Sequence, residues 1–134
     1  MRWLALLALV LAMTDLAPIA DESTVNLVTT GRKSGQPRPV TIWFVVDGGA
    51  VYVQAGKRGS TDWFRNLRKT STVTLEFGDR RLRGEAKVID DAAENERVHA
   101  LFQKKYWLAR AASWVGAGIG SGRVVRIEIV GPAA

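Results

Sequence analysis

Hydrophobic and polar positions alternate in short runs along most of the chain, a pattern typical of β-strands with one buried face. Alternating or β-branched runs predict strands at 24–30, 39–46, 51–54, 72–77, 81–88 and 125–129. The run at 39–46 is nearly all apolar, which predicts a strand covered on both faces. Asp47-Gly48-Gly49 predicts a tight hairpin, and Gly84, on the inward side of its strand, predicts a bend or bulge.

Two segments between these strands follow a helical pattern instead. A short helix is predicted from Ser60 or Thr61 to about Arg68, with Asp62 favourably placed in its first turn. A longer helix is predicted from Asp90 or Asp91 to about Ser113. Its apolar stripe consists of Val98, Leu101, Phe102, Leu108 and Ala112. The expected class is mainly β with flanking helices (α+β): a six-stranded antiparallel barrel, closed or partly closed.

The chain begins with an apolar segment. Trp3–Met13 is unbroken and follows a single cation, but it is shorter than the about 20 residues of a membrane-spanning helix. The run fits the hydrophobic region of an export signal cleaved near Ala20, and equally a helix that lies over the domain or on a membrane surface. Both alternatives stay open: an exported protein, or a cytoplasmic or membrane-associated one. Residues 21–134 are expected to form a single domain.

The amino-acid composition limits the kinds of functional site that the chain can form. The 134 residues include 47% hydrophobic and 24% charged side chains, as in ordinary globular proteins. Cysteine is absent, which excludes disulfides and thiolate ligands, and His99 is the only histidine, so no metal site is predicted. The net charge of +6 suits an anionic partner. No basic tail and no DNA-binding motif is present, so a small polyanion is preferred to nucleic acid.

The cations gather in two places. One is the stretch from Thr29 to Arg38 between two predicted strands, where glycines let the backbone turn and expose its N–H groups beside positive side chains. The other runs from Lys57 to Lys69 and includes the start of the short helix, whose free N–H groups also attract anions. Together they predict a phosphate- or carboxylate-binding site.

Two motifs carry a resemblance to a known family. They are Leu27-Val28-Thr29-Thr30-Gly31-Arg32-Lys33-Ser34-Gly35-Gln36-Pro37-Arg38 and Asp62-Trp63-Phe64-Arg65-Asn66-Leu67, with the hairpin at 47–54 between them. As a pair they resemble the deazaflavin-dependent nitroreductase/quinone reductase family. That family has the split β-barrel fold of FMN-binding, pyridoxamine-phosphate-oxidase-like proteins.

The resemblance implies hydride transfer from a reduced deazaflavin, or alternatively FMN, to a quinone, nitro compound or similar electrophile. The alternative is a split-barrel module that binds flavin, tetrapyrrole or a lipid-like ligand without turnover. A homodimer is also implied. Tyr106 is the candidate proton donor. Candidate cofactor-binding residues are Gly31, Arg32, Lys33, Ser34, Gly35, Arg38, Lys57, Arg58, Gly59, Ser60 and Trp63.

Overall fold

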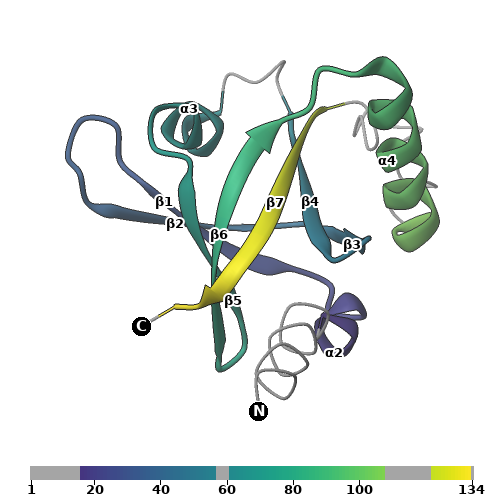
Figure 1. Ribbon diagram of the computed structural model, residues 1–134, viewed down its shortest axis with the longest axis horizontal. Coiled ribbons are helices and arrows are strands. Elements are labelled where there is room, and N and C mark those ends of the chain that lie inside the picture. The colour runs from purple at the N-terminus through teal and green to yellow at the C-terminus, as the bar shows by residue number, and fades with distance from the viewer. Residues whose placement is uncertain (1–15, 57–60, 108–121, 134) are drawn as a thin grey trace, which may run out of the picture.

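In the computed structural model, residues 16–56, 61–107 and 122–133 are described, and they form one antiparallel sheet of seven strands (Figure 1). Its order is β2-β1-β5-β6-β7-β4-β3. The strands are β1 Val25–Thr30, β2 Pro37–Ile42, β3 Val45–Asp47, β4 Ala50–Ala55, β5 Thr72–Phe77, β6 Arg80–Val88 and β7 Arg123–Pro132. The helices are α2 Ala17–Ala20, α3 Asp62–Lys69 and α4 Ala92–Lys105.

The two edge strands of this sheet, β2 and β3, follow each other in the chain. They are joined only by Trp43 and Phe44, so the sheet curls into a partly closed barrel. The six-strand prediction was wrong by one, because the run at 39–46 breaks here. Phe44 turns into the core and is fully buried, whereas Trp43 stays 39% exposed.

The expectation that this run is covered on both faces was also wrong. Most of β2 is exposed, because it is the edge strand beside β1. Pro37 and Pro39 lie in it, which an edge strand tolerates since no second neighbour needs their missing N–H groups. The apolar run therefore contains an exposed edge strand of the barrel instead of a strand covered on both faces.

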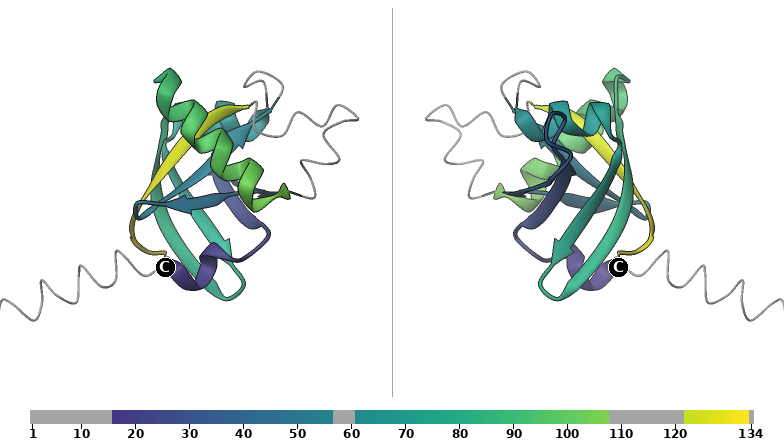
Figure 2. Two further views of the ribbon diagram at one scale, coloured as in Figure 1. Left: turned by 90° about the vertical axis from the view of Figure 1, so that its right-hand side faces the viewer. Right: turned by 90° about the vertical axis from the view of Figure 1, so that its left-hand side faces the viewer.

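Two apolar clusters hold the fold together. The larger fills the barrel with inward-facing side chains such as Leu27, Val51, Leu75 and Ile127. The smaller lies on the outer side of β4 and β7, where Val98 and Phe102 of α4 pack against Tyr52. Figure 2 shows α4 crossing this side of the barrel.

The predicted cap of α4 is confirmed, whereas Thr61, one of the two predicted caps of α3, occupies the N-cap position of that helix without a side-chain capping hydrogen bond. Asp91 caps α4 by accepting a hydrogen bond from the Glu94 N–H (2.9 Å). Asp62 lies in the first turn of α3, and Arg68 and Lys69 lie in its last turn, where they complement the helix dipole. The predicted helix beyond Trp107 lies outside the described residues.

At the amino-terminal side, Leu16 and Ile19 are buried in the barrel core. A cut near Ala20 would remove both of these core side chains. Within the described segments, no helix has the length and apolarity needed to cross a membrane.

The predicted bulge at Gly84 is confirmed. The register between β6 and β7 shifts between Arg83 and Gly84. A Cβ on Gly84 would lie 2.4 Å from Cγ2 of Ile127 and 3.1 Å from the Glu128 oxygen.

We expect Gly84→Ala to lower the free energy of unfolding by about 1–3 kcal/mol, because the rigid β-branched side chain of Ile127 must move. Urea denaturation measures this. Gly48→Ala is the control, because Gly48 has a positive φ but open space around it, so an added Cβ there meets no neighbour. An equal loss of unfolding free energy in both variants would contradict the packing explanation for Gly84.

Candidate functional site

The basic turn, Gly31–Arg38, connects β1 to β2 and is closed by its own hydrogen bonds. The Gly31 N–H donates to the Gln36 oxygen (2.8 Å), and the Gly35 N–H donates to the Gly31 oxygen (2.8 Å). Gly35 has φ +68°, a conformation that favours glycine. The Gln36 N–H donates to Oγ of Ser34 (3.1 Å), and a Cβ on Gly31 would lie only 2.5 Å from that oxygen. Gly31, Ser34 and Gly35 therefore shape the turn.

Asn66 of α3 ties this turn to the barrel. The residue is only 3% exposed, and its Nδ2 donates to Oγ1 of the buried Thr29 (3.1 Å). Its Oδ1 accepts from the backbone N–H of Arg32 (3.2 Å) and from Nη1 of the same residue (2.9 Å). The Asn66 amide thus forms hydrogen bonds with a side chain of β1, with the backbone of the turn and with the guanidinium of Arg32.

The guanidinium of Arg32 is directed at α3. Besides Asn66, it contacts the carboxylate of Asp62 (3.2 Å) and the Asp62 backbone oxygen (3.5 Å). Lys69, at the other end of α3, donates to the Arg32 carbonyl (2.7 Å). Arg32 is therefore largely a clamp between the turn and the helix. Lys69, which could be read from the sequence as part of a solvated helix face, also holds the turn.

A hollow of about 490 Å³ lies between the turn and α3. We call it the basic groove. The exposed side chains of Lys33 and Arg38 line it, and neither makes an ion pair with any of the described residues. Trp63 and Asn66 form the side provided by α3. The complete lining is Gly31, Arg32, Lys33, Ser34, Arg38, Pro39, Val40, Asp62, Trp63 and Asn66.

The start of α3 faces the same region without a side-chain cap. Thr61 occupies the N-cap position, but its hydroxyl is buried and has no hydrogen-bond partner among the described residues. The first N–H groups of α3 thus have no capping oxygen, an arrangement suited to an anion. Lys57, Arg58, Gly59 and Ser60, the other half of the predicted site, lie outside the described residues.

A second hollow, of about 300 Å³, lies at the opposite end of β2. We call it the aromatic hollow. Thr41, Ile42 and Trp43 line it from the end of β2, and Gln54 and Phe102 line it from β4 and α4. No charged side chain is part of this lining. It suits a flat, neutral group.

Tyr106 supports the aromatic hollow from behind. Its ring stacks on Trp43, with centroids 4.6 Å apart and planes 10° from parallel. Its hydroxyl accepts from the Phe44 N–H (3.0 Å) and lies 2.9 Å from the oxygens of both Phe44 and Ser23. Burial raises the pKa of Tyr106 above its ordinary value, only partly opposed by the bond to Phe44. The hydroxyl is therefore protonated at neutral pH and fully engaged by backbone groups.

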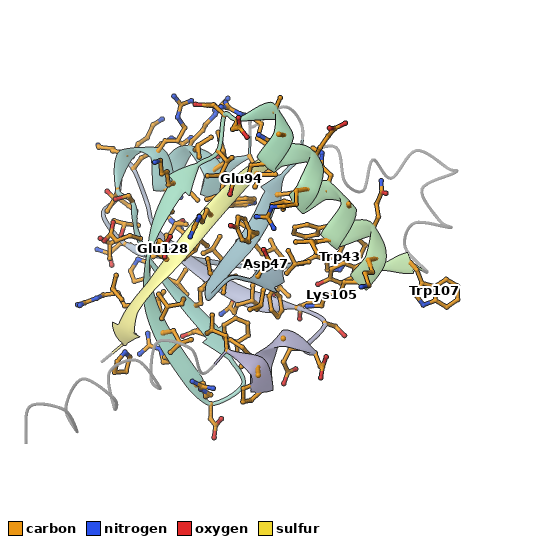
Figure 3. The ribbon with its side chains drawn as sticks, turned by 45° about the vertical axis from the view of Figure 1, so that its right-hand side comes forward. Trp43, Asp47, Glu94, Lys105, Trp107 and Glu128 are labelled. Atoms are coloured by element: carbon orange, nitrogen blue, oxygen red, sulfur yellow. The ribbon has the colours of Figure 1, made fainter. Side chains whose placement is uncertain are left out.

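Lys105 lies close to Trp43, whereas Trp107 points outward (Figure 3). The Nζ of Lys105 donates to the Phe44 oxygen (2.9 Å) and lies 3.6 Å from the centroid of the Phe44 ring. Partial burial lowers the pKa of Lys105 to about 8, and the charges of Asp21 and Glu22 act in the opposite direction. This lysine and Tyr106 together fix the bend that separates β2 from β3.

The two hollows share β2. Arg38, Pro39 and Val40 line the basic groove, and the next three residues line the aromatic hollow. In Figure 1, one end of β2 reaches the turn beside α3, and its other end leads to β3 near α4. The site is thus an open edge strand with cations at one end and aromatic rings at the other.

The arrangement is not that of a metal centre or a triad. The described residues contain no group of three or more His, Cys, Asp or Glu that could hold a metal ion. Nε2 of His99 lies 2.9 Å from the oxygen of Gly122, so this side chain links α4 to the residue that precedes β7.

Comparison with known proteins assigns the chain to a family and supports its fold. The sequence model of the F420H(2)-dependent quinone reductases matches residues 16–120, most of the chain. The chain belongs to this family. Its membership confirms the resemblance inferred from the two motifs, and the split-barrel class with it.

Individual relatives agree with this assignment. The F420H(2)-dependent quinone reductase of Mycobacterium tuberculosis strain H37Rv is 35% identical over 66 residues, which cover 47% of this chain and 44% of that protein. The chain thus matches less than half the length of this relative. A solved F420-H2 dependent reductase shares 25% identity and a TM-score of 0.62, covering 80% of this chain and 95% of that one. The heme storage protein HutZ of Vibrio cholerae (16% identity, TM-score 0.61, 90% and 89% covered) shares the fold alone.

The sequence did not indicate the roles of two residues, Asn66 and Gln54, in this site. Asn66 enters the sequence analysis only as a member of the second motif, and only its spatial neighbours reveal that it anchors the basic turn. Gln54 ends the predicted strand 51–54 and begins a segment, Gln54-Ala55-Gly56-Lys57, that departs from the family pattern. A signal existed, because Gln54 is the one polar side chain in the otherwise apolar or aromatic run Ala50–Ala55.

Proposed function

We propose that this chain binds a reduced deazaflavin coenzyme along β2 and transfers hydride to a quinone or a similar small electrophile. Family membership supports the coenzyme and the reaction class. The observation that carries the proposal is the pairing of a basic groove with an uncharged aromatic hollow on one exposed edge strand. A deazaflavin coenzyme has the matching polarity, with a flat ring at one end and a phosphate and acidic tail at the other.

The residues of the basic groove fit the anionic end. Lys33 and Arg38 would hold phosphate or carboxylate, because both are exposed and unpaired among the described residues. Arg32 would contribute mainly by holding the turn against α3, since Asp62 and Asn66 already engage its guanidinium. The uncapped start of α3 adds backbone donors.

The length of β2 fits the separation of the two ends. The strand has six residues, so at about 3.3 Å per residue it spans about 20 Å. Trp43 and Phe102 would contact the flat ring at the far end. When bound, the reduced coenzyme supplies the hydride. The protein contributes binding, orientation and exclusion of water, which together bring two rings to reacting distance.

Tyr106 as the proton donor stays a prediction. Its hydroxyl already bonds to the backbone of Phe44 and Ser23, so we expect Tyr106→Phe to act mainly on stability. Loss of these bonds should lower the free energy of unfolding by about 1–2 kcal/mol and leave kcat within about fivefold. Proton donation in the rate-limiting step would instead lower kcat by about 10²–10⁴-fold and alter its pH profile. Urea denaturation and steady-state kinetics with menadione distinguish the two outcomes.

The proposed function is tested with purified protein, reduced deazaflavin coenzyme and reduced FMN. Ligand fluorescence measures binding, and menadione-dependent oxidation measures turnover. Binding with oxidation is the expected result for the deazaflavin, with weaker binding of FMN because it lacks the long acidic tail. Binding without oxidation would identify a binding module, and no binding of either would refute the proposal.

Association with a membrane surface and formation of a homodimer stay predictions. Both involve the sequence before residue 16 or surfaces on which no partner is present. Size-exclusion chromatography and vesicle co-sedimentation of the full chain test them directly.

A further inference from the structure

The basic groove contains an acidic side chain. Among the described residues that line it, Asp62 is the only Asp or Glu. Its carboxylate is 85% exposed and lies 3.2 Å from Nη2 of Arg32. Asp62 is also the first residue of α3, where the helix dipole favours a negative charge. A resident carboxylate therefore occupies a position that would suit the anionic group of a ligand.

The ion pair between Arg32 and Asp62 is not what holds the basic turn in place. Exposed ion pairs contribute little to folding stability. The turn is held by bonds that leave the Asp62 carboxylate out. Oδ1 of Asn66 accepts from the backbone N–H (3.2 Å) and from Nη1 (2.9 Å) of Arg32, and Lys69 donates to the Arg32 carbonyl (2.7 Å). Nη2 of Arg32 can therefore leave Asp62 while the turn stays anchored to α3.

The position of this carboxylate makes the groove respond differently to small and to extended anions. A small anion that takes Nη2 of Arg32 from Asp62 loses one ion pair for the one it forms. A small anion that stays on Lys33 or Arg38 is repelled by the carboxylate, because these side chains line one hollow and the screening length at physiological salt is about 8 Å. An extended polyanion instead contacts both unpaired cations at once and outweighs the repulsion.

We propose that Asp62 determines which anions the basic groove accepts: its carboxylate holds Nη2 of Arg32 in the ligand-free protein, and an extended polyanion displaces it. This deepens the proposed function, on which the identity of the polyanion as the acidic end of the coenzyme rests. Asp62 lowers the affinity of the groove for every anion, so that phosphate and other small anions do not fill it.

Asp62→Asn tests the proposal, because it removes the charge and keeps the size of the side chain. Asp90→Asn is the matched control, since the Asp90 carboxylate is 84% exposed and lies 3.1 Å from Nη2 of Arg123, but lines neither hollow. Both variants remove one negative charge, so a general electrostatic effect would appear in both. Titration calorimetry measures the affinity for inorganic pyrophosphate and for the reduced coenzyme. We expect Asp62→Asn to bind both about five- to tenfold more tightly than the wild type, and Asp90→Asn to match the wild type.

The sign of the effect separates this role from a structural one. If Asp62 served mainly to hold Arg32 and the turn, Asp62→Asn would weaken binding. That result, or affinities within about twofold of the wild type for both ligands, would overturn the proposal. Asp62→Glu keeps the charge and should bind both ligands as weakly as the wild type does. A gain in Asp62→Glu equal to that in Asp62→Asn would also overturn it.

The displacement and the wider function are tested separately. In ¹³C-labelled wild-type protein, the carboxyl resonance of Asp62 should shift when pyrophosphate saturates the groove, whereas that of Asp90 should not. An unshifted Asp62 resonance would overturn the displacement. Tighter pyrophosphate binding by Asp62→Asn, with no coenzyme binding by this variant or by the wild type, would refute the proposed function and support the role of Asp62.

Discussion

Replacing Lys33 and Arg38 together with alanine is expected to weaken binding of the tail-bearing coenzyme by about 100-fold or more. Both cations line the basic groove and neither is paired within the described residues. A hydrogen bond to a charged group contributes about 1.5–3 kcal/mol, so the loss of two contacts corresponds to at least two orders of magnitude in Kd. Fluorescence titration of the reduced coenzyme measures the change.

The same double variant should bind a tail-less deazaflavin almost as well as the wild type does. Its residual affinity for the natural coenzyme should also depend less on salt, because screened charge attraction has been removed. Arg83→Ala with Lys87→Ala is the matched control, since both are exposed cations on β6 that line neither hollow. Equal losses with and without the tail would contradict the assignment of the groove to the anionic end.

Replacing Asn66 with leucine is expected to lower the free energy of unfolding by about 2–4 kcal/mol. The substitution keeps the approximate size of the side chain but leaves the buried Thr29 hydroxyl and the Arg32 N–H without partners. Each unsatisfied buried group costs about 1–3 kcal/mol. Coenzyme affinity should fall as well, because the turn that presents Lys33 and Arg38 loses its anchor. Urea denaturation and coenzyme titration measure the two effects.

A double-mutant cycle separates lost hydrogen bonds from general disruption. Thr29→Val removes the hydroxyl that Asn66 satisfies, so it should cost little when added to Asn66→Leu. Additive losses would indicate that the two side chains act independently, contrary to their 3.1 Å contact. Asn66→Asp gives a second comparison, since it retains acceptors for Arg32 but buries a charge beside Thr29.

The positions of most strands along the chain could be predicted because alternation is a local property. Val73, Leu75 and Phe77 face the core as their spacing indicates, and Gly84 lies at the bulge. The break at Trp43 was missed for the opposite reason. An apolar run looks the same whether both faces are covered or an edge strand is left open, so composition could not distinguish these cases.

Part of the candidate site could also be predicted, because the motif of the basic turn is a local feature of the sequence. The motif around Arg32 and Lys33 indicates an anion-binding turn, and the structure places it beside Trp63 and the start of α3. That Arg32 clamps the helix while Lys33 faces the groove depends on Asn66, 34 residues along the chain from Arg32. No pattern within the turn encodes that division of roles.

By itself, the sequence determined most of the strand positions, the Asp91 cap of α4, the excess of positive charge and the family, because each depends on residues near one another in the chain. The tertiary structure alone decided that β2 is an open edge, that it joins a basic groove to an aromatic hollow, and that the Asp62 carboxylate lies in that groove against Arg32. These features arise when β2, β4, α3 and α4 pack together. Burial and hydrogen-bond satisfaction are properties of that packing, and no single segment carries them.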